Sequence, residues 1–401
     1  MTMEIQPTLN CLAVLPLTLF WAACEVTPQQ ADEPVSMSVE LRAQAIEYIA
    51  ESLRDSVEIA AGRFPVATEK GVWELNDGGW TGGYFAGMLW LMYAETGDEY
   101  WRGHAEKYTW LLEEYKGNVD MSDIGILYWP SFDLGHSLTL DERMREVGLD
   151  GARSMMKRFI PGGGYVQNWG KLGEEDQMGF VIIDCLINLD HLYWAANQTG
   201  ESAFSEAATR HAERTRVSHV RPDHSSFQVV EFNPDTGEML RGFTKQGYTD
   251  ESTWSRGQSW GIYGFTRVYK HTRDRKFLEA AMRMADWFIE RLPPDFVPYW
   301  DFSAPGIPDE PRDTSAASMA ASAMLELATL VEDPDRSNYY RSTAGKILVS
   351  LTENYLTRDL PGRNGGVLSG GTYFYEIGRS VDQANIWGDF YYLEAMQRWQ
   401  E

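Results

Sequence analysis

The chain has 401 residues, 43% of them hydrophobic and 23% charged, which is typical of a globular protein with one large domain or two ordinary ones. The formal net charge of −24 argues against nucleic acid as a partner and against a charge-driven membrane contact, because both need clustered Lys and Arg. The 15 Trp, 20 Tyr and 17 Phe exceed what a core requires, and flat aromatic rings suit a site that binds sugars.

The first predicted element is a signal segment over residues 1–24. Its apolar run starts at Cys11, is too short to span a bilayer, and ends in small residues directly before Cys24, as in bacterial lipoproteins. Trp21 stands where such sites usually carry Leu, and the segment has no basic residue, so lipidation of Cys24, simple secretion and a misassigned start codon all stay open. We therefore expect an exported bacterial protein, periplasmic or anchored to the outer membrane only through a lipid at Cys24, with a linker over residues 25–38.

The elements predicted from residue 39 onward repeat one theme: an aromatic-rich helix, a short polar turn and a more charged amphipathic helix. The clear copies pair residues 80–93 with 100–114, 180–196 with 204–217, and 259–271 with 277–291. Weaker copies cover 124–159 and 315–351, and single terminal helices cover 39–61 and 386–399. The sequence therefore predicts twelve helices.

This alternation suits a two-layer ring, whose inner helices are buried all round and whose outer helices show one face to water. Residues 39–401 are therefore predicted to form a single all-α catalytic domain, an (α/α)6 toroid. A repeat solenoid would show the same periodicity, but the terminal helices lack polar capping faces and are expected to pair and close the ring. One short β-hairpin, over residues 227–242, is predicted as an insertion and is the one convincing strand pattern.

Stretches rich in Gly, Pro or Asp interrupt the helical pattern at residues 69–79, 161–179, 223–253 and 293–313. In a toroid such stretches join the two layers at one end and form a wall above the inner helices. Loops in this position commonly carry the chemistry of a protein. We therefore expect the functional residues to gather at this end of the ring.

Asp184 lies inside the apolar run 180–189, which predicts a helix that carries Asn188 one turn later on the same face. Burial in such a helix would raise the pKa of the carboxyl, and a carboxyl that stays protonated near neutral pH can act as a general acid. A buried Asp that bonds to a neighbouring helix would give the same pattern. The residues alone leave both interpretations open.

Asp123 directly precedes a predicted inner helix, so its simplest role is that of an N-cap. Arg256 and Trp260 are four residues apart on one predicted helix and therefore share a face. A guanidinium beside an indole could hold the carboxylate and ring of a uronic acid, and an ion pair between helices beside a core Trp would use the same residues. No His or Cys spacing fits a zinc site and no Gly-rich loop fits a nucleotide, so neither a metal nor a cofactor is expected.

A series of short motifs runs through the chain in one order: Trp80-Thr81-Gly82-Gly83, Asp123-Ile124-Gly125, Ile182-Ile183-Asp184-Cys185-Leu186-Ile187-Asn188-Leu189, His219-Val220-Arg221-Pro222-Asp223, Trp254-Ser255-Arg256-Gly257-Gln258-Ser259-Trp260, Pro298-Tyr299-Trp300-Asp301-Phe302, Arg312-Asp313-Thr314-Ser315-Ala316 and Ile386-Trp387-Gly388-Asp389. With these motifs, residues 40–401 resemble the unsaturated glucuronyl hydrolases, glycoside hydrolase family 88. Several motifs in one order are more specific than any single one.

The resemblance implies a catalytic Asp at the Ile-Ile-Asp motif, here Asp184, and a second essential Asp at the Asp-x-Gly motif, here Asp123. It further matches substrate-binding positions at Trp80, Gln246, Arg256 and Trp260. The chain departs from the family at Gln228, where characterised members carry a His that touches the substrate, and at Lys245, where another His is common. Gln228 is therefore expected to bind substrate, and both departures are expected to alter the preference for the sugar or its sulfation.

The family's reaction removes a 4,5-unsaturated uronic acid from the non-reducing end of oligosaccharides made by polysaccharide lyases. By resemblance, Asp184 would protonate C4 of the C4=C5 double bond, and water would then add at C5 with Asp184 as the base. The resulting hemiketal would open and expel the neighbouring sugar. Asp123 would orient Asp184 or the water, and no cofactor would take part.

An unsaturated rhamnogalacturonyl hydrolase that acts on pectin fragments would share the toroid and the chemistry, but the motif at residues 254–260 favours the glucuronyl group. A non-catalytic glycan-binding lipoprotein would need the aromatic residues and not an acid at Asp184. The parent polymer, whether ulvan, chondroitin, hyaluronan, heparin or a bacterial gum, stays open.

Overall fold

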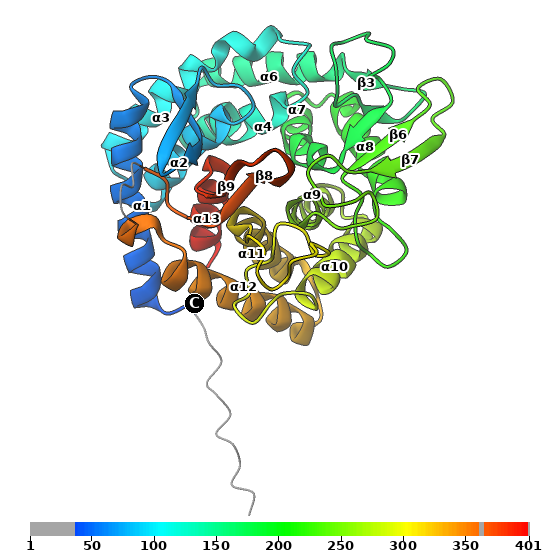
Figure 1. The fold of residues 1–401 in the computed structure, drawn as a ribbon. Coiled ribbons are helices and arrows are strands. Elements are labelled where there is room, and N and C mark those ends of the chain that lie inside the picture. Colours follow the sequence, from blue (N-terminus) through cyan, green and yellow to red (C-terminus); the bar gives the residue numbers. More distant parts are fainter. Residues whose placement is uncertain (1–36, 361–364, 400–401) are drawn as a thin grey trace, which may run out of the picture. The chain divides into compact units, whose positions relative to one another are not determined.

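Two concentric layers of helices make up the structure, a computed structural model that describes residues 37–360 and 365–399 (Figure 1). The inner layer contains α2 (Gly82–Thr96), α4 (Ile124–Tyr128) continued by η2 (Trp129–Asp133) and α5 (Leu134–Thr139), α7 (Leu189–Thr199), α9 (Ser255–Thr272), α11 (Thr314–Leu330) and α13 (Ile386–Arg398). The outer layer contains α1 (Val39–Ala60), α3 (Glu99–Leu111), α6 (Glu142–Met156), α8 (Ser202–Ser218), α10 (Arg275–Ile289) and α12 (Pro334–Asn354). The predicted (α/α)6 toroid is confirmed.

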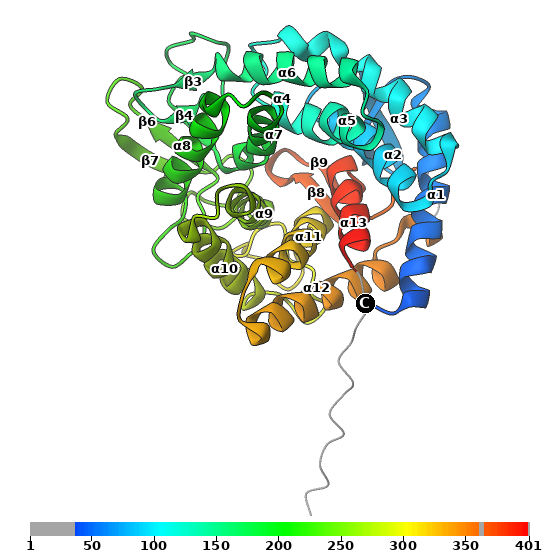
Figure 2. The same ribbon diagram turned by 180° about the vertical axis from the view of Figure 1, so that it is seen from behind.

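The inner helices contact one another in a closed sequence, from α2 through α4, α7, α9, α11 and α13 back to α2 (Figure 2). The first outer helix, α1, contacts both α12 and α13. The terminal helices therefore pair and close the ring, and the open solenoid is excluded.

Burial follows the two layers. All residues of α11 from Thr314 to Ala328 are buried, as expected for a helix enclosed on every side. The outer helix α10 buries one stripe, which includes Phe277, Ala281 and Phe288, and exposes the opposite face. Within the part of the chain that the structure describes, no helix is long and apolar enough to cross a membrane.

The segment before α7 differs from the expectation. In place of one helix over residues 180–196, the chain forms the strand β5 (Phe180–Ile182), the 3-10 helix η3 (Ile183–Asn188) and then α7. The β-branched run that ends at Ile183 favours an extended strand, and β5 finds a partner in β6. Because a 3-10 helix has three residues per turn, the prediction that Asp184 and Asn188 share one helical face was wrong.

The predicted hairpin is present as β6 (Val229–Phe232) and β7 (Met239–Phe243), and β5 joins it to make a three-stranded sheet. The expectation of a single hairpin was wrong, because three further antiparallel pairs connect the layers: β1 (Phe64–Glu69) with β2 (Val72–Asn76), β3 (Phe159–Ile160) with β4 (Tyr165–Val166), and β8 (Gly371–Phe374) with β9 (Arg379–Gln383). Short 3-10 turns lie at η1 (Glu113–Gly117), η4 (Thr357–Asp359) and η5 (Tyr375–Ile377). β3 and β4 have only two residues each, and β1 is buried at five of its six residues, so none of these three strands shows an alternation of apolar and polar residues.

The predictions for the N-terminal part fall on residues that the structure does not describe. The signal segment 1–24, including Cys24, and the linker up to residue 36 lie outside the described residues. Ser38, at the end of the predicted linker, caps α1 by accepting a hydrogen bond from the amide of Leu41 at 3.1 Å.

Candidate active site

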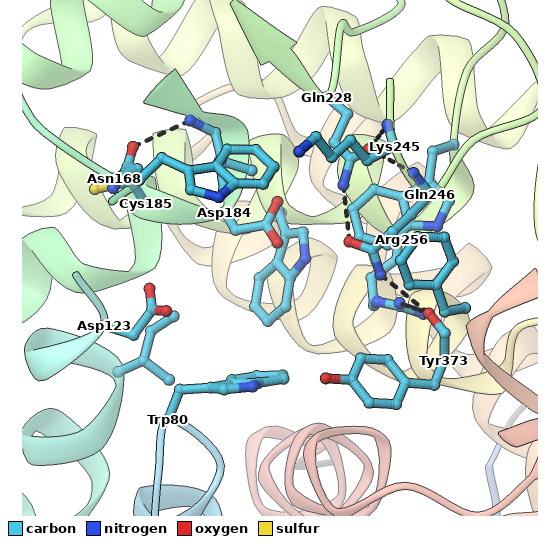
Figure 3. Close-up of a pocket in the computed structure, with 16 residues that line it drawn as sticks. Trp80, Asp123, Asn168, Asp184, Cys185, Gln228, Lys245, Gln246, Arg256 and Tyr373 are labelled. Carbon is cyan, nitrogen blue, oxygen red and sulfur yellow. Dashed lines mark hydrogen bonds between the residues drawn. The ribbon is translucent and has the colours of Figure 1, made fainter. Parts of the chain in front are cut away.

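A pocket of about 350 Å3 lies at the end of the ring where the inner helices begin (Figure 3). Its lining contains all the residues singled out from the sequence: Trp80, Asp123, Asp184, Gln228, Gln246, Arg256 and Trp260. It also contains Lys245, which the sequence predicted to alter substrate preference, and residues that sequence reasoning did not place there: Ile126, Asn168, Trp169, Ile182, Cys185, Trp254, Tyr373 and Phe374. The N-termini of inner helices carry the positive end of the helix dipole, which favours an anionic ligand at this end.

The β5–β6 pairing places Asp184 beside Gln228. Ile182 lies opposite Val229 in the sheet, and the Ile183 amide donates to the Gln228 carbonyl at 2.9 Å. Asp184 follows β5 and Gln228 precedes β6, so both side chains lie at the same end of this strand pair. The sheet therefore fixes Asp184 from its N-terminal side, and η3 fixes it from its C-terminal side.

Asp184 has the titration behaviour expected of a general acid. Its pKa is raised to about 7, chiefly because the carboxyl is buried; the charge of Arg256 acts to lower the pKa, and the negative charge of Asp123 acts to raise it. Its Oδ1 atom is buried and has no hydrogen-bond partner among the described residues. A carboxyl with this pKa is about half protonated at neutral pH, and its protonated form can release a proton into the pocket.

Asp123 occupies the position before α4, but its side chain makes no capping hydrogen bond, so its predicted N-cap role was wrong. Its Oδ1 instead accepts a hydrogen bond from Asn188 Nδ2 at 3.2 Å. Asn188 also accepts, through Oδ1, the amide of Ile126 at 2.8 Å. Asn188 therefore satisfies the start of α4, which leaves the Asp123 carboxylate to face the pocket. Burial raises the pKa of Asp123.

Gly125, the glycine of the Asp-x-Gly motif, allows the start of α4 to lie close to the backbone of Asn188. A Cβ atom on Gly125 would lie 2.4 Å from the carbonyl oxygen of Asn188 and 2.6 Å from its Cα. Both are backbone atoms, so neither could rotate away. Gly125 thus brings α4 against η3 and sets the position of Asp123 relative to Asp184.

Arg256 and Trp260 share one face of α9, as predicted, and both line the pocket. The Arg256 guanidinium forms an ion pair with Asp313 at 2.5 Å and donates to the carbonyls of Thr372 at 2.6 Å and Tyr373 at 2.7 Å. The geometry thus favours the interpretation in which Arg256 joins protein elements. Its role toward a substrate carboxylate stays a prediction.

Gln228 organises the turn beside it. Its Oε1 accepts three hydrogen bonds, from Thr244 Oγ1 at 2.9 Å and from the amides of Lys245 and Gln246 at 2.8 Å each. Its Nε2 donates to Gln246 Oε1 at 2.8 Å, and Gln246 Nε2 donates to the Tyr373 carbonyl at 3.0 Å. The Gln228 side chain therefore holds the neighbouring pocket residues in position.

Aromatic rings form the opposite side of the pocket. Trp80 packs against Trp387 with ring centroids 5.2 Å apart, and its ring lies 6.4 Å from that of Tyr373, which Figure 3 shows beside it. Tyr373 comes from β8, a segment without a sequence prediction, although the run Thr372-Tyr373-Phe374 has the residue types that favour strands. In residues 37–360 and 365–399, no three His, Cys, Asp or Glu side chains are grouped so that they could hold a metal ion.

Comparison with known proteins agrees with this geometry. The sequence model of Glycosyl Hydrolase Family 88 matches residues 58–271. The unsaturated glucuronyl hydrolase of Bacillus sp. (strain GL1) is 40% identical over 344 residues, which cover 84% of this chain and 90% of that protein. The unsaturated chondroitin disaccharide hydrolase of Streptococcus agalactiae serotype III (strain NEM316) is 36% identical over 363 residues, which cover 88% of this chain and 90% of that protein.

The solved structures lead to the same family. The crystal structure of unsaturated glucuronyl hydrolase from Bacillus sp. GL1, described as responsible for the degradation of glycosaminoglycan, matches with a TM-score of 0.85 at 38% sequence identity. The match covers 89% of this chain and 96% of that chain. The chain therefore belongs to Glycosyl Hydrolase Family 88, the family of the unsaturated glucuronyl hydrolases, and is a glycoside hydrolase.

Proposed function

We propose that the protein removes a 4,5-unsaturated uronic acid from the non-reducing end of lyase-generated oligosaccharides. The observation that carries this proposal is the Asp184 carboxyl, which lines the pocket. Its pKa of about 7 means that a protonated form is available there as a proton donor. The relatives bear the names of enzymes that act on unsaturated glucuronyl and chondroitin disaccharide substrates. The aromatic lining offers surfaces on which sugar rings can stack.

In the proposed reaction Asp184 donates its proton to C4 of the double bond, and positive charge develops at C5 and the ring oxygen. The ionised Asp123 stabilises this charge, and a water molecule adds at C5 while Asp184 takes up its proton. The product is a hemiketal, which opens and releases the neighbouring sugar. Asp184 thus ends the cycle protonated, and the net reaction consumes one water.

Gln246 and Trp260 are proposed to contact the substrate, since both line the pocket near these two acids. Trp80 is proposed to support the sugar ring from the aromatic side of the pocket. The position of Arg256, buried and paired with Asp313, supports a role in holding the pocket together and shaping its charge.

The test is to mix the protein with unsaturated disaccharides made by lyases and to follow the ultraviolet absorbance of the conjugated double bond. We expect absorbance to fall as the double bond is consumed, with release of the reducing-end sugar in equal amount. Absorbance that stays constant, together with measurable binding of the same disaccharides, would support a non-catalytic glycan-binding protein instead. Turnover only of rhamnogalacturonan fragments would support the pectin-directed alternative.

We further propose that the protein is exported, on the basis of the apolar segment that ends at Cys24. Expression of the full chain in a bacterium, followed by cell fractionation, tests export. Labelling with radioactive palmitate, compared between the wild type and C24S, tests the lipid anchor. Label in the wild type that disappears in C24S would support lipidation, and unlabelled protein in the periplasm would support simple secretion.

A further inference from the structure

The charge of the pocket depends on two cations, and only one of them is neutralised by the protein. Arg256 is buried and paired with Asp313. Lys245 is exposed at the edge of the pocket and lies within 4.0 Å of no carboxylate among the described residues. A protein with a net charge of −24 repels an anionic ligand at long range, so a local unpaired cation is required to hold one.

The Lys245 side chain is already placed for this task. Its Nζ lies 3.7 Å from the centroid of the Trp169 ring, so the ammonium group lies over the indole face. This contact uses one side of the ammonium group and leaves N–H donors on the other side. A lysine held against a ring also has less rotational freedom to lose when it binds.

Both partners are fixed by their backbones. The Lys245 amide donates to Gln228 Oε1 at 2.8 Å. The Trp169 carbonyl accepts from Gln167 Nε2 at 2.6 Å and from Arg158 Nη2 at 3.4 Å. The side chains that make these hydrogen bonds are all buried: Gln228, Gln167 and Arg158. The backbones of Lys245 and Trp169 are therefore held in fixed positions.

We propose that Lys245 forms an anion subsite of the pocket, which binds a carboxylate or a sulfate ester of the substrate. This inference rests on the proposed function and adds a specificity residue to it. An ammonium is a compact charge without the fixed fork of a guanidinium, and it can therefore donate hydrogen bonds to either a planar carboxylate or a tetrahedral sulfate. Figure 3 shows Lys245 with Gln228 and Gln246 on one side of the pocket and Asp123 on the other.

The test compares K245M with K107M. Lys107 is a matched control because it is exposed, lies over the Tyr108 ring at 5.5 Å, is absent from the pocket lining, and its loss changes the net charge equally. The substrates are an unsaturated disaccharide without sulfate, its sulfated forms, and the methyl ester of its uronate. We expect K245M to raise KM about 10-fold with little change in kcat, K245R to stay within about 3-fold of the wild type, and K107M to have no effect.

The pattern across substrates identifies the anion. A higher KM for all free acids, with the methyl ester unaffected, assigns Lys245 to the uronate carboxylate. A higher KM for sulfated forms alone assigns it to the sulfate. A KM within 2-fold of the wild type on every substrate overturns the anion subsite.

A binding measurement separates this inference from the proposed function. The same disaccharides are titrated calorimetrically into D184N and into the D184N/K245M double variant. If the wild type turns over none of the disaccharides, the proposed function fails, and a 10-fold weaker Kd in the double variant still supports the subsite. Equal Kd values in the two variants overturn the subsite, whatever the turnover.

Discussion

Two groups of buried carboxylates lie on or beside the inner helices, and their pKa values are shifted in opposite directions from the ordinary value. The pocket acids, Asp123 and Asp184, have raised pKa values. The paired acids, Asp190 and Glu326, have lowered pKa values although burial acts on them in the same upward direction. The difference therefore comes from their neighbours.

The paired acids are surrounded by cations. Asp190 accepts from Arg267 Nε and from His271 Nε2, each at 2.7 Å. Glu326 accepts from Arg267 Nη1 at 2.9 Å and from Lys270 Nζ at 2.6 Å. Arg267 lies eleven residues after Arg256 on α9, roughly 16 Å along the helix axis at the usual rise per residue.

At the pocket end of α9 the Arg256 guanidinium is already paired with Asp313, and its effect on the pKa of Asp184 is smaller than that of burial, as is the effect of Arg158 on the pKa of Asp123. Helix α9 thus places Arg267 in direct contact with the paired acids, whereas its Arg256 is paired with Asp313 and not with the pocket acids. Burial by itself does not make a carboxyl a proton donor or a fixed anion, because the cations around it decide between the two. The following experiments test that distinction.

The largest effect is expected for D184N. The amide keeps the shape of the carboxyl but has no acidic proton to deliver, so we expect kcat to fall by about 10³-fold or more with normal folding. The measurement is the rate of absorbance loss with unsaturated disaccharides. D235N, an exposed Asp in the β6–β7 turn, is the matched control and should keep full activity. Activity of D184N close to that of the wild type would refute the assignment.

The second experiment removes the counter-charge of the paired acids with R267M. Two buried carboxylates then lose a cation, and we expect the free energy of unfolding to fall by about 3–5 kcal/mol. Urea denaturation measures it, with R153M as the control, since Arg153 pairs with Asp150 at an exposed site and should matter by less than about 1 kcal/mol. The KM of the folded fraction should be unchanged. A loss below about 1 kcal/mol for R267M would show that the cluster does not stabilise the fold.

D123N comes next. Because the Asp123 side chain caps no helix, the substitution should cost little stability, while the lost negative charge should lower kcat by about 100-fold. Thermal denaturation and turnover are measured on the same preparation. If Tm falls and kcat does not, Asp123 serves the structure and not the reaction.

The pH dependence follows from the direction of the pocket pKa values. Asp184 must be protonated to act, so kcat/KM should fall about 10-fold per pH unit above its pKa of about 7, and it should also fall at low pH as Asp123 becomes protonated. Folding favours the neutral form of Asp184, whose ordinary pKa is 3.8. Its stabilising contribution is complete below that value and is lost as pH rises through about 7.

D184N should therefore be more stable than the wild type at pH 8 and about equal to it at pH 4, as measured by Tm. An activity profile that is flat between pH 6 and 9 would show that Asp184 does not supply the proton. A D184N variant that is less stable than the wild type at both pH values would show that the carboxylate is not strained by burial.

The smallest effect is expected for Q228H. An imidazole cannot accept the three hydrogen bonds that Gln228 Oε1 accepts, so the turn that carries Lys245 and Gln246 should shift. We expect the ratio of kcat/KM values among disaccharides that differ in sulfation or linkage to change about 3-fold to 10-fold, with the double-bond chemistry intact. An unchanged ratio in a folded variant would mean that Gln228 is not a specificity position.

The helical ring could be predicted because helices of the two layers differ in how apolar residues are distributed around them. An inner helix such as α2 is apolar on nearly every side, and an outer helix such as α10 has one apolar stripe. Asp123 and Asp184 were recognisable because their motifs are local. The 3-10 turn that carries Asp184 was not, because the pairing of β5 with β6 overrides the helical pattern of the run.

The partners of the site residues were harder to predict, since they come from distant parts of the chain. Gln246 and Tyr373, which share a hydrogen bond, are 127 residues apart. Arg256 meets Asp313 only because the N-termini of α9 and α11 lie side by side in the closed ring. A local pattern can therefore suggest that an arginine binds an anion, but only the folded ring shows that the carboxylate paired with Arg256 belongs to the protein itself, at Asp313.

Closure of the ring by α13 has a consequence for how the protein is made. This helix follows all the other layer helices in the chain, yet it contacts α2, and Phe390 and Tyr391 pack against Tyr84 with ring centroids 5.2 and 5.7 Å apart. Domains begin to fold while the ribosome is still adding residues. Until α13 has left the ribosome, α2 and α11 each present an unpaired aromatic or apolar face, so the ring can close only after translation has passed residue 398.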